Sequence, residues 1–64
     1  MKYRIKELRE EKRMTQEELS EKSGVSRTII SKLEQEKPVN MLTDTLSKIA
    51  SALDVKVSSL FLQD

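Results

Sequence analysis

The sequence has no cysteine and no histidine, and it has only one glycine, one proline, one tyrosine and one phenylalanine. Without cysteine or histidine, disulfide bonds, the usual zinc sites and the Ser–His and Cys–His nucleophiles are all excluded. The scarcity of aromatic residues disfavours strands, which prefer β-branched and aromatic side chains, and it disfavours RNA binding by base stacking. We therefore expect an all-α protein that is not an enzyme and needs no metal or cofactor.

Long apolar runs are also missing. No stretch approaches the roughly 20 apolar residues that a membrane-spanning helix needs, and residues 1–13 are too charged for a signal peptide. We expect a cytoplasmic protein. A chain of 64 residues has room for one domain, 1–64. Its stability should be marginal, because so small a domain buries only about 60% of the surface that its unfolded chain exposes.

The charge is nearly balanced, with 12 basic and 11 acidic residues and a formal net charge of +1. This balance is too weak to indicate nucleic-acid binding by itself. The two signs are distributed unevenly, with a basic excess in residues 1–13 and 26–40 and an acidic excess in residues 14–25 and 41–64. Any surface that binds a polyanion must therefore be local.

Apolar residues recur with helical spacing along most of the chain. Helices are expected over residues 2–12, 16–22 and 27–35. A longer apolar stripe then runs from 42 to 53, with Asn40 or Thr43 as candidates for its N-cap. A last helical stripe comprises Val57, Leu60 and Phe61. The pattern therefore predicts five short helices.

The segments 16–22 and 27–35 carry clear end signals. Thr15 and Glu18 have the spacing of a capping box. Gly24 stands where a helix C-terminus favours a left-handed residue, and Ser26 can cap the next helix. Two short helices joined by Ser23-Gly24-Val25 form a helix-turn-helix. Its apolar side should be buried on the flanking helices, with Leu19, Val25, Ile30 and Leu33 against Ile5, Leu8, Leu46, Ile49 and Leu53.

The segment 27–35 divides into two faces when it is drawn as a helix at about 100° per residue. One face is apolar, with Ile29 at its edge beside Ile30 and Leu33. The other face carries two cations and no carboxylate. Taken alone, this polar face is as consistent with a solvated surface as with a site for a polyanion. It comprises Arg27, Thr28, Ser31, Lys32 and Gln35.

Two stretches of the sequence resemble the lambda repressor/Cro-like family, also called the XRE family. They read Thr15-Gln16-x-x-Leu19-Ser20-x-x-x-Gly24-Val25-Ser26-x-x-x-Ile30-Ser31-x-Leu33-Glu34 and Thr45-Leu46-x-Lys48-Ile49-Ala50-x-Ala52-Leu53-x-Val55. The resemblance covers nearly the whole chain and implies a five-helix, all-α DNA-binding domain. It also implies that the third helix enters the major groove of DNA.

Carried over by position, the resemblance implies two groups of DNA-contacting residues. An arginine at the start of the third helix suits guanine O6 and N7, and a residue at the start of the second helix lies where the helix dipole favours an anion. The base-reading candidates are Arg27, Thr28, Ser31 and Lys32. The candidates for the DNA backbone are Gln16, Gln35 and Lys37.

The resemblance further implies a charge pair between the first and third helices, formed by Arg9 and Glu34. The sequence departs from the family pattern at three places. Ile29 occupies an often polar position, where it either touches a thymine methyl group or packs. Met41-Leu42 replaces the usual start of the fourth helix, and Arg13 stands in a turn where a positive φ would strain it.

The resemblance implies that the protein binds double-stranded DNA in a sequence-specific manner and regulates transcription. Between repression and activation, we expect repression. A single small module buries little interface on DNA, so we expect a homodimer on a pseudo-palindromic operator. The candidates for the dimer contact are Val57, Phe61 and Leu62. The alternative is an antitoxin or anti-repressor that uses the same fold to bind another protein.

Overall fold

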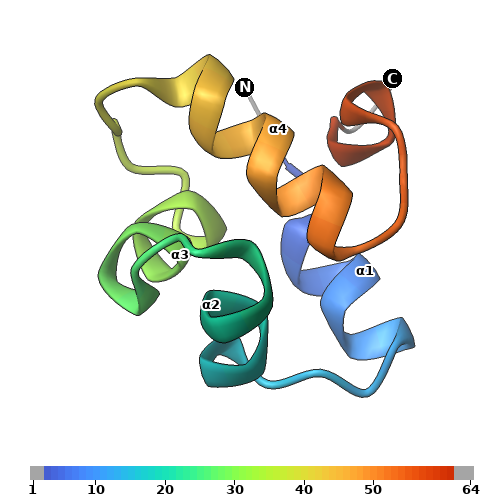
Figure 1. The fold of residues 1–64 in the computed structure, drawn as a ribbon. Helices are drawn as coiled ribbons and strands as arrows, with labels where there is room; N and C mark the ends of the chain where they lie inside the picture. Colours follow the sequence, from blue (N-terminus) through green and yellow to red (C-terminus); the bar gives the residue numbers. More distant parts are fainter. Residues whose placement is uncertain (1–2, 62–64) are drawn as a thin grey trace.

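The computed structural model describes residues 3–61, which form four α-helices and one 3₁₀ helix (Figure 1). In Figure 1, α2 and α3 lie on the opposite side of the molecule from η1, and α4 runs between them. The all-α class predicted from the sequence is confirmed. In chain order, the elements are α1 (Ile5–Glu11), α2 (Gln16–Ser23), α3 (Arg27–Glu34), α4 (Leu42–Ala52) and the 3₁₀ helix η1 (Val57–Leu60).

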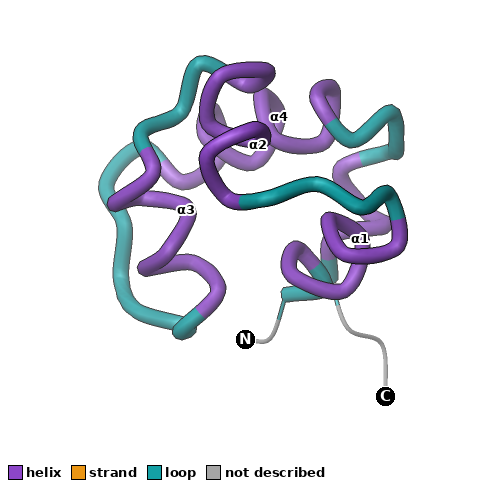
Figure 2. The backbone as a smooth tube through the Cα atoms, turned by 90° about the horizontal axis from the view of Figure 1, so that it is seen from below, coloured by secondary structure: helices purple, strands orange, loops and turns teal. Residues whose placement is uncertain are grey.

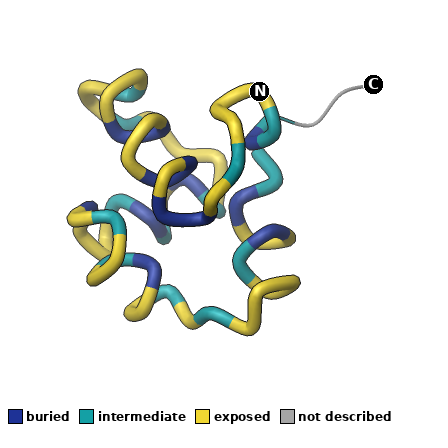
Figure 3. The backbone as a smooth tube through the Cα atoms, turned by 45° about the vertical axis from the view of Figure 1, so that its right-hand side comes forward, coloured by how far each residue is buried: buried dark blue, intermediate teal, exposed yellow. Residues whose placement is uncertain are grey.

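All five elements contribute to one apolar core. Buried and exposed segments alternate along each helix, as amphipathic helices require (Figure 3). Burying one leucine or isoleucine side chain stabilises a fold by about 1.5–3 kcal/mol. All the residues predicted to be buried on either side of the helix-turn-helix are in this core. It comprises Ile5, Leu8, Leu19, Val25, Ile30, Leu33, Leu46, Ile49, Ala50, Ala52, Leu53 and Leu60.

The ends of α2 and the start of α3 are held by the predicted caps. Thr15 Oγ1 accepts from the Glu18 N–H at 3.0 Å, and the Glu18 carboxylate accepts from the Thr15 N–H at 3.1 Å. Gly24 ends α2 with a φ of 76°, and the Ser26 side chain caps α3. These caps set the turn of the helix-turn-helix and therefore the direction in which α3 leaves α2.

The small side chain of Ser20 makes a further contact across this turn. Its hydroxyl donates to the Val25 carbonyl oxygen at 2.7 Å. A larger side chain at this position would force α2 away from the turn. Ser20 therefore adds a hydrogen bond at a point where the two helices approach closely.

The first helix is shorter than predicted, because it begins at Ile5 rather than at residue 2. Tyr3 instead forms an isolated antiparallel bridge with Phe61, and the two rings lie 5.6 Å apart. The Arg4 N–H donates to the Leu60 carbonyl oxygen at 2.6 Å. Because Tyr3 and Arg4 pair with the C-terminal segment, α1 begins only at Ile5. Residue 2 itself lies outside the described residues.

The fifth predicted helix is wrong in type. Val57–Leu60 forms one turn of 3₁₀ helix, and Phe61 already has extended dihedral angles, with φ −98° and ψ 137°. The bridge to Tyr3 needs this extended backbone, so the helix cannot continue. The predicted apolar stripe is consequently divided, because Leu60 is fully buried, Phe61 is half-buried and Val57 is 39% exposed.

Two departures from the family pattern lie at left-handed backbone positions. Arg13 has a φ of 55°, as predicted, and Met41 has a φ of 53°. Met41 is the N-cap of α4 and makes no side-chain capping bond, so the prediction of Asn40 or Thr43 is wrong. The chain reaches Met41 through the loop 35–41, which Figure 2 shows turning back from α3 toward α4.

No helix within residues 3–61 combines the length and the apolar character that crossing a bilayer requires.

Candidate functional site

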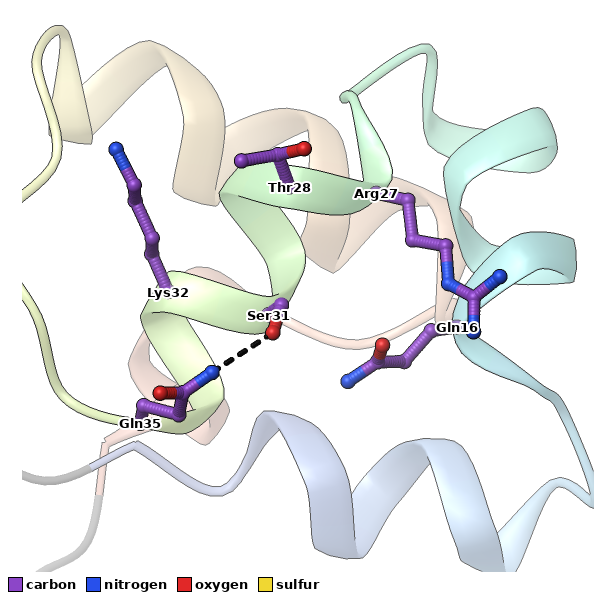
Figure 4. A pocket seen from close by; sticks show the side chains of 6 residues that line it. All are labelled: Gln16, Arg27, Thr28, Ser31, Lys32 and Gln35. Carbon is purple, nitrogen blue, oxygen red and sulfur yellow. Dashed lines mark hydrogen bonds between the residues drawn. The ribbon is translucent and has the colours of Figure 1, made fainter.

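A surface hollow of about 460 Å³ lies where the polar face of α3 meets the start of α2 (Figure 4). In Figure 4, the side chain of Gln16 extends from α2 toward α3, and Arg27 reaches back toward α2. The structure therefore brings together six of the seven residues predicted to contact DNA. The lining residues are Gln16, Arg27, Thr28, Ser31, Lys32 and Gln35.

The hollow is cationic. Arg27 and Lys32 are its only charged lining residues. Neither takes part in a salt bridge within the part of the chain that the structure describes, where the three ion pairs are Arg4–Glu7, Arg9–Glu34 and Lys48–Asp44. Both positive charges are therefore available to an anionic ligand.

Most of this polar face is accessible. Arg27, Thr28, Lys32 and Gln35 are exposed, whereas Ser31 is half-buried. The Gln35 amide donates to Ser31 Oγ at 2.8 Å, as Figure 4 shows. The Ser31 hydroxyl hydrogen remains able to donate to a ligand. The face can thus offer several donors from one helix.

The remaining predicted backbone residue lies beyond the helix. Lys37 is exposed in the loop after α3, and its N–H donates to the Lys32 carbonyl oxygen at 2.8 Å. It does not line the hollow. The loop places its cation past the C-terminal end of the polar face.

A second, smaller hollow lies on the flank of α3. It measures about 270 Å³, and Lys32 lines both hollows. Ile29 is half-buried and packs against the core. Of the two roles considered for Ile29, packing is therefore present in the structure, and part of the side chain remains at the surface. The lining residues are Ile29, Lys32, Pro38, Val39 and Asn40. Sequence reasoning missed the loop residues among them, because no periodicity relates a loop to a helix.

A polar network lies behind the first hollow. Arg9 Nε donates to Glu34 Oε2 at 2.9 Å, and Arg9 Nη2 donates to Glu34 Oε1 at 3.2 Å. The pair predicted from the sequence is thus in contact, and the side chains of Arg9 and Glu34 are only 11% and 6% exposed. The hydrogen bond with Glu34 raises the pKa of Arg9 above its ordinary value. Arg9 Nη1 also donates to the Met14 carbonyl oxygen at 2.7 Å.

Gln16 joins this network to the hollow. Its Nε2 donates to Glu34 Oε1 at 3.0 Å. The sequence did not indicate this contact, because the two residues lie 18 positions apart in different helices. Gln16 therefore lines the hollow with its amide already held on one side.

Of the predicted dimer residues, Val57 and Phe61 lie among the described residues. Val57 is exposed, whereas Phe61 packs on Tyr3 within the same chain. Leu62 lies outside the described residues.

Comparison with known proteins assigns the chain to a family. A family model described as helix-turn-helix matches residues 5–60. The HTH-type transcriptional regulator SinR of Bacillus subtilis (strain 168) is 39% identical over 57 residues, which are 89% of this chain and 51% of SinR. SinR of Bacillus licheniformis matches with the same identity and coverage.

The immunity repressor protein of Bacillus phage phi105 is 37% identical over 57 residues, which are 89% of this chain and 39% of that protein. No solved structure gives a significant match. The chain spans about half the length, or less, of these relatives. Its match to the family model covers α1 through η1. The chain belongs to the helix-turn-helix family of the XRE type.

Proposed function

We propose that this chain binds double-stranded DNA in a sequence-specific manner and regulates transcription, with α3 in the major groove. The observation that carries the proposal is the cationic hollow at the α2–α3 junction, which contains Arg27 and Lys32 and no carboxylate. DNA carries one negative charge per roughly 1.7 Å of helix axis, so a local cationic surface can bind it although the net charge is only +1.

The polar face of α3 supplies the groups for reading bases. In this assignment, Arg27 donates two hydrogen bonds to guanine, and Thr28 contacts a thymine methyl group or donates its hydroxyl. Ser31 and Lys32 lie one turn further along the same face. Gln16, Gln35 and Lys37 contact phosphates and set the position of the domain on the duplex.

Repression by a homodimer is the finer part of the proposal. The relatives include a protein named as a repressor and proteins named as transcriptional regulators, which favours DNA over a protein partner of the antitoxin kind. Pairing through Val57, Phe61 and Leu62 would place two copies of α3 about one DNA turn apart, roughly 34–36 Å. If Leu62→Glu leaves both sedimentation and cooperative DNA binding unchanged, Leu62 is not at the dimer contact.

The experiment that tests DNA binding is selection from a random DNA pool at a stated salt concentration, followed by footprinting and titration. Arg27→Ala should weaken binding to the selected site by about 1–3 kcal/mol and relax the preference at one position. Gln16→Ala should weaken binding to all sequences alike. Lys56→Ala, which removes an exposed cation between α4 and η1, is the control for the loss of one positive charge.

Failure to enrich any sequence would contradict sequence-specific binding. An unchanged preference in Arg27→Ala would contradict the assignment of Arg27 to a base. A footprint over a single asymmetric half-site would contradict the dimer.

A further inference from the structure

One buried carboxylate connects the interior of the protein to the hollow. Glu34 accepts two hydrogen bonds from Arg9, at 2.9 and 3.2 Å, and one from Gln16 at 3.0 Å. Its side chain is only 6% exposed, so it does not itself present a surface to a ligand. Gln16 does, because it lines the hollow. Glu34 can therefore affect a ligand in the hollow through its hydrogen bond with Gln16.

The chemistry of Glu34 decides which way the Gln16 amide faces. A carboxylate paired with an arginine only accepts hydrogen bonds, so Gln16 must turn its NH₂ group toward Glu34 and its oxygen elsewhere. A glutamine amide has nearly the same shape in its two flipped orientations, and only its partners distinguish them. Glu34 therefore selects one orientation and leaves Gln16 with one N–H and one oxygen for other partners.

We propose that Glu34 is a positioning residue for DNA binding, because it holds the Gln16 amide with its second N–H available to a DNA phosphate oxygen. This inference rests on the proposed function. A phosphate oxygen accepts hydrogen bonds and repels another acceptor. A phosphate that contacts the Nε2 end of the Gln16 amide would meet the amide oxygen, and not an N–H, if the amide were flipped. The carboxylate of Glu34 thus acts on DNA without touching it.

A double-mutant cycle in DNA affinity tests this role. The four proteins are the wild type, Gln16→Ala, Glu34→Gln and the double variant, titrated against one selected DNA site under conditions where circular dichroism shows each to be folded. Gln16→Ala should weaken binding about three- to tenfold per subunit, the range expected for one hydrogen bond. Glu34→Gln should weaken binding by a smaller factor in the wild type and have no further effect in Gln16→Ala.

The matched control is Glu7→Gln. It also removes a carboxylate from an Arg–Glu pair and makes the same change in charge, but it lies on the exposed side of α1 and does not line the hollow. Its effect on DNA affinity should be the same with and without Gln16. Independent, additive effects of Glu34→Gln and Gln16→Ala would overturn the inference.

A second measurement keeps the test decisive if Glu34→Gln does not fold. In NMR spectra of the wild type, one side-chain amide proton of Gln16 should exchange slowly with water. The other should move downfield when DNA is added. Two rapidly exchanging protons that DNA leaves unchanged would overturn the positioning role. Absence of any DNA binding would overturn the proposed function as well, whereas DNA binding with an additive cycle would overturn only the role of Glu34.

Discussion

Replacing Glu34 with alanine should destabilise the protein far more than removing a carboxylate from its surface. The change removes a salt bridge and three hydrogen bonds, two from Arg9 and one from Gln16. It also leaves the Arg9 guanidinium, whose side chain is only 11% exposed, without its counter-charge. Breaking a buried ion pair by removing one partner costs about 3–5 kcal/mol.

The lower end of this range is the better expectation here. Arg9 still donates to the Met14 carbonyl oxygen at 2.7 Å in the variant, so its guanidinium is not left without any partner. A loss of about 3 kcal/mol corresponds to a fall in melting temperature of about 12–24 °C for a domain of this size. Small domains have a total stability of only about 5 kcal/mol or somewhat more, so a large fraction of that stability disappears.

The assay is thermal unfolding followed by circular dichroism, with Glu7→Ala as the matched control. Glu7 also pairs with an arginine, at 2.9 Å, but the side chains of Arg4 and Glu7 are 33% and 55% exposed. Exposed pairs contribute little, so Glu7→Ala should melt close to the wild type. Equal melting temperatures for the two variants would refute the reasoning, because burial would then not distinguish the two pairs.

Three further predictions concern the backbone and the surface. Met41→Asn should raise the free energy of unfolding by about 0.5–1 kcal/mol, because asparagine tolerates a φ of 53° better than methionine does and Met41 is 76% exposed; an unchanged urea midpoint would count against this. Gly24→Ala should lower the free energy of unfolding by about 1 kcal/mol through the φ of 76° alone, since a Cβ there meets nothing within 4 Å; a neutral result in the same urea assay would contradict it. The hydrogen bond from Arg4, followed by the charge of Arg4, lowers the pKa of Glu7. The Arg4–Glu7 pair therefore stabilises the fold fully at a pH above the ordinary glutamate pKa, and this stabilisation is lost as the pH falls through the pKa that Glu7 has in the folded protein. A carbon-13 NMR titration should therefore give a lower midpoint for Glu7 in the wild type than in Arg4→Ala, and equal midpoints would contradict the pairing.

Much of the fold could be predicted because its signals are local. The capping box at Thr15 and Glu18, the left-handed Gly24 and the Ser26 cap each depend on a few neighbouring residues, and all are present in the structure. The apolar spacing in α3 likewise separates Ile30 and Leu33, which are buried, from the polar face. Such patterns reflect helix geometry and do not depend on distant parts of the chain.

The wrong predictions concern the ends of the chain and one loop, where distant contacts or backbone conformation decide. The bridge between Tyr3 and Phe61 shortens the first helix and stops the last one, and no helical periodicity reveals such a pairing. The cap of α4 falls on Met41 because the loop enters the helix with a left-handed residue. The contact of Gln16 with Glu34 was missed for a similar reason, since it joins two helices and no local pattern relates them.

The presence of a buried ion pair at Arg9 and Glu34 is better explained by the hydrogen bond that Glu34 accepts from Gln16 than by stability alone. Replacing a buried ion pair by apolar residues of similar volume is often neutral or stabilising by about 1–4 kcal/mol. Arg9→Met combined with Glu34→Leu should therefore cost less stability than Glu34→Ala, although the Met14 carbonyl oxygen loses the hydrogen bond that Arg9 Nη1 donates at 2.7 Å. No apolar side chain, however, can accept the hydrogen bond that Gln16 Nε2 makes to Glu34 Oε1 at 3.0 Å. We thus expect this double variant to be more stable than Glu34→Ala and to bind the selected DNA more weakly than the wild type does. Wild-type affinity in the double variant would mean that the pair serves the fold alone.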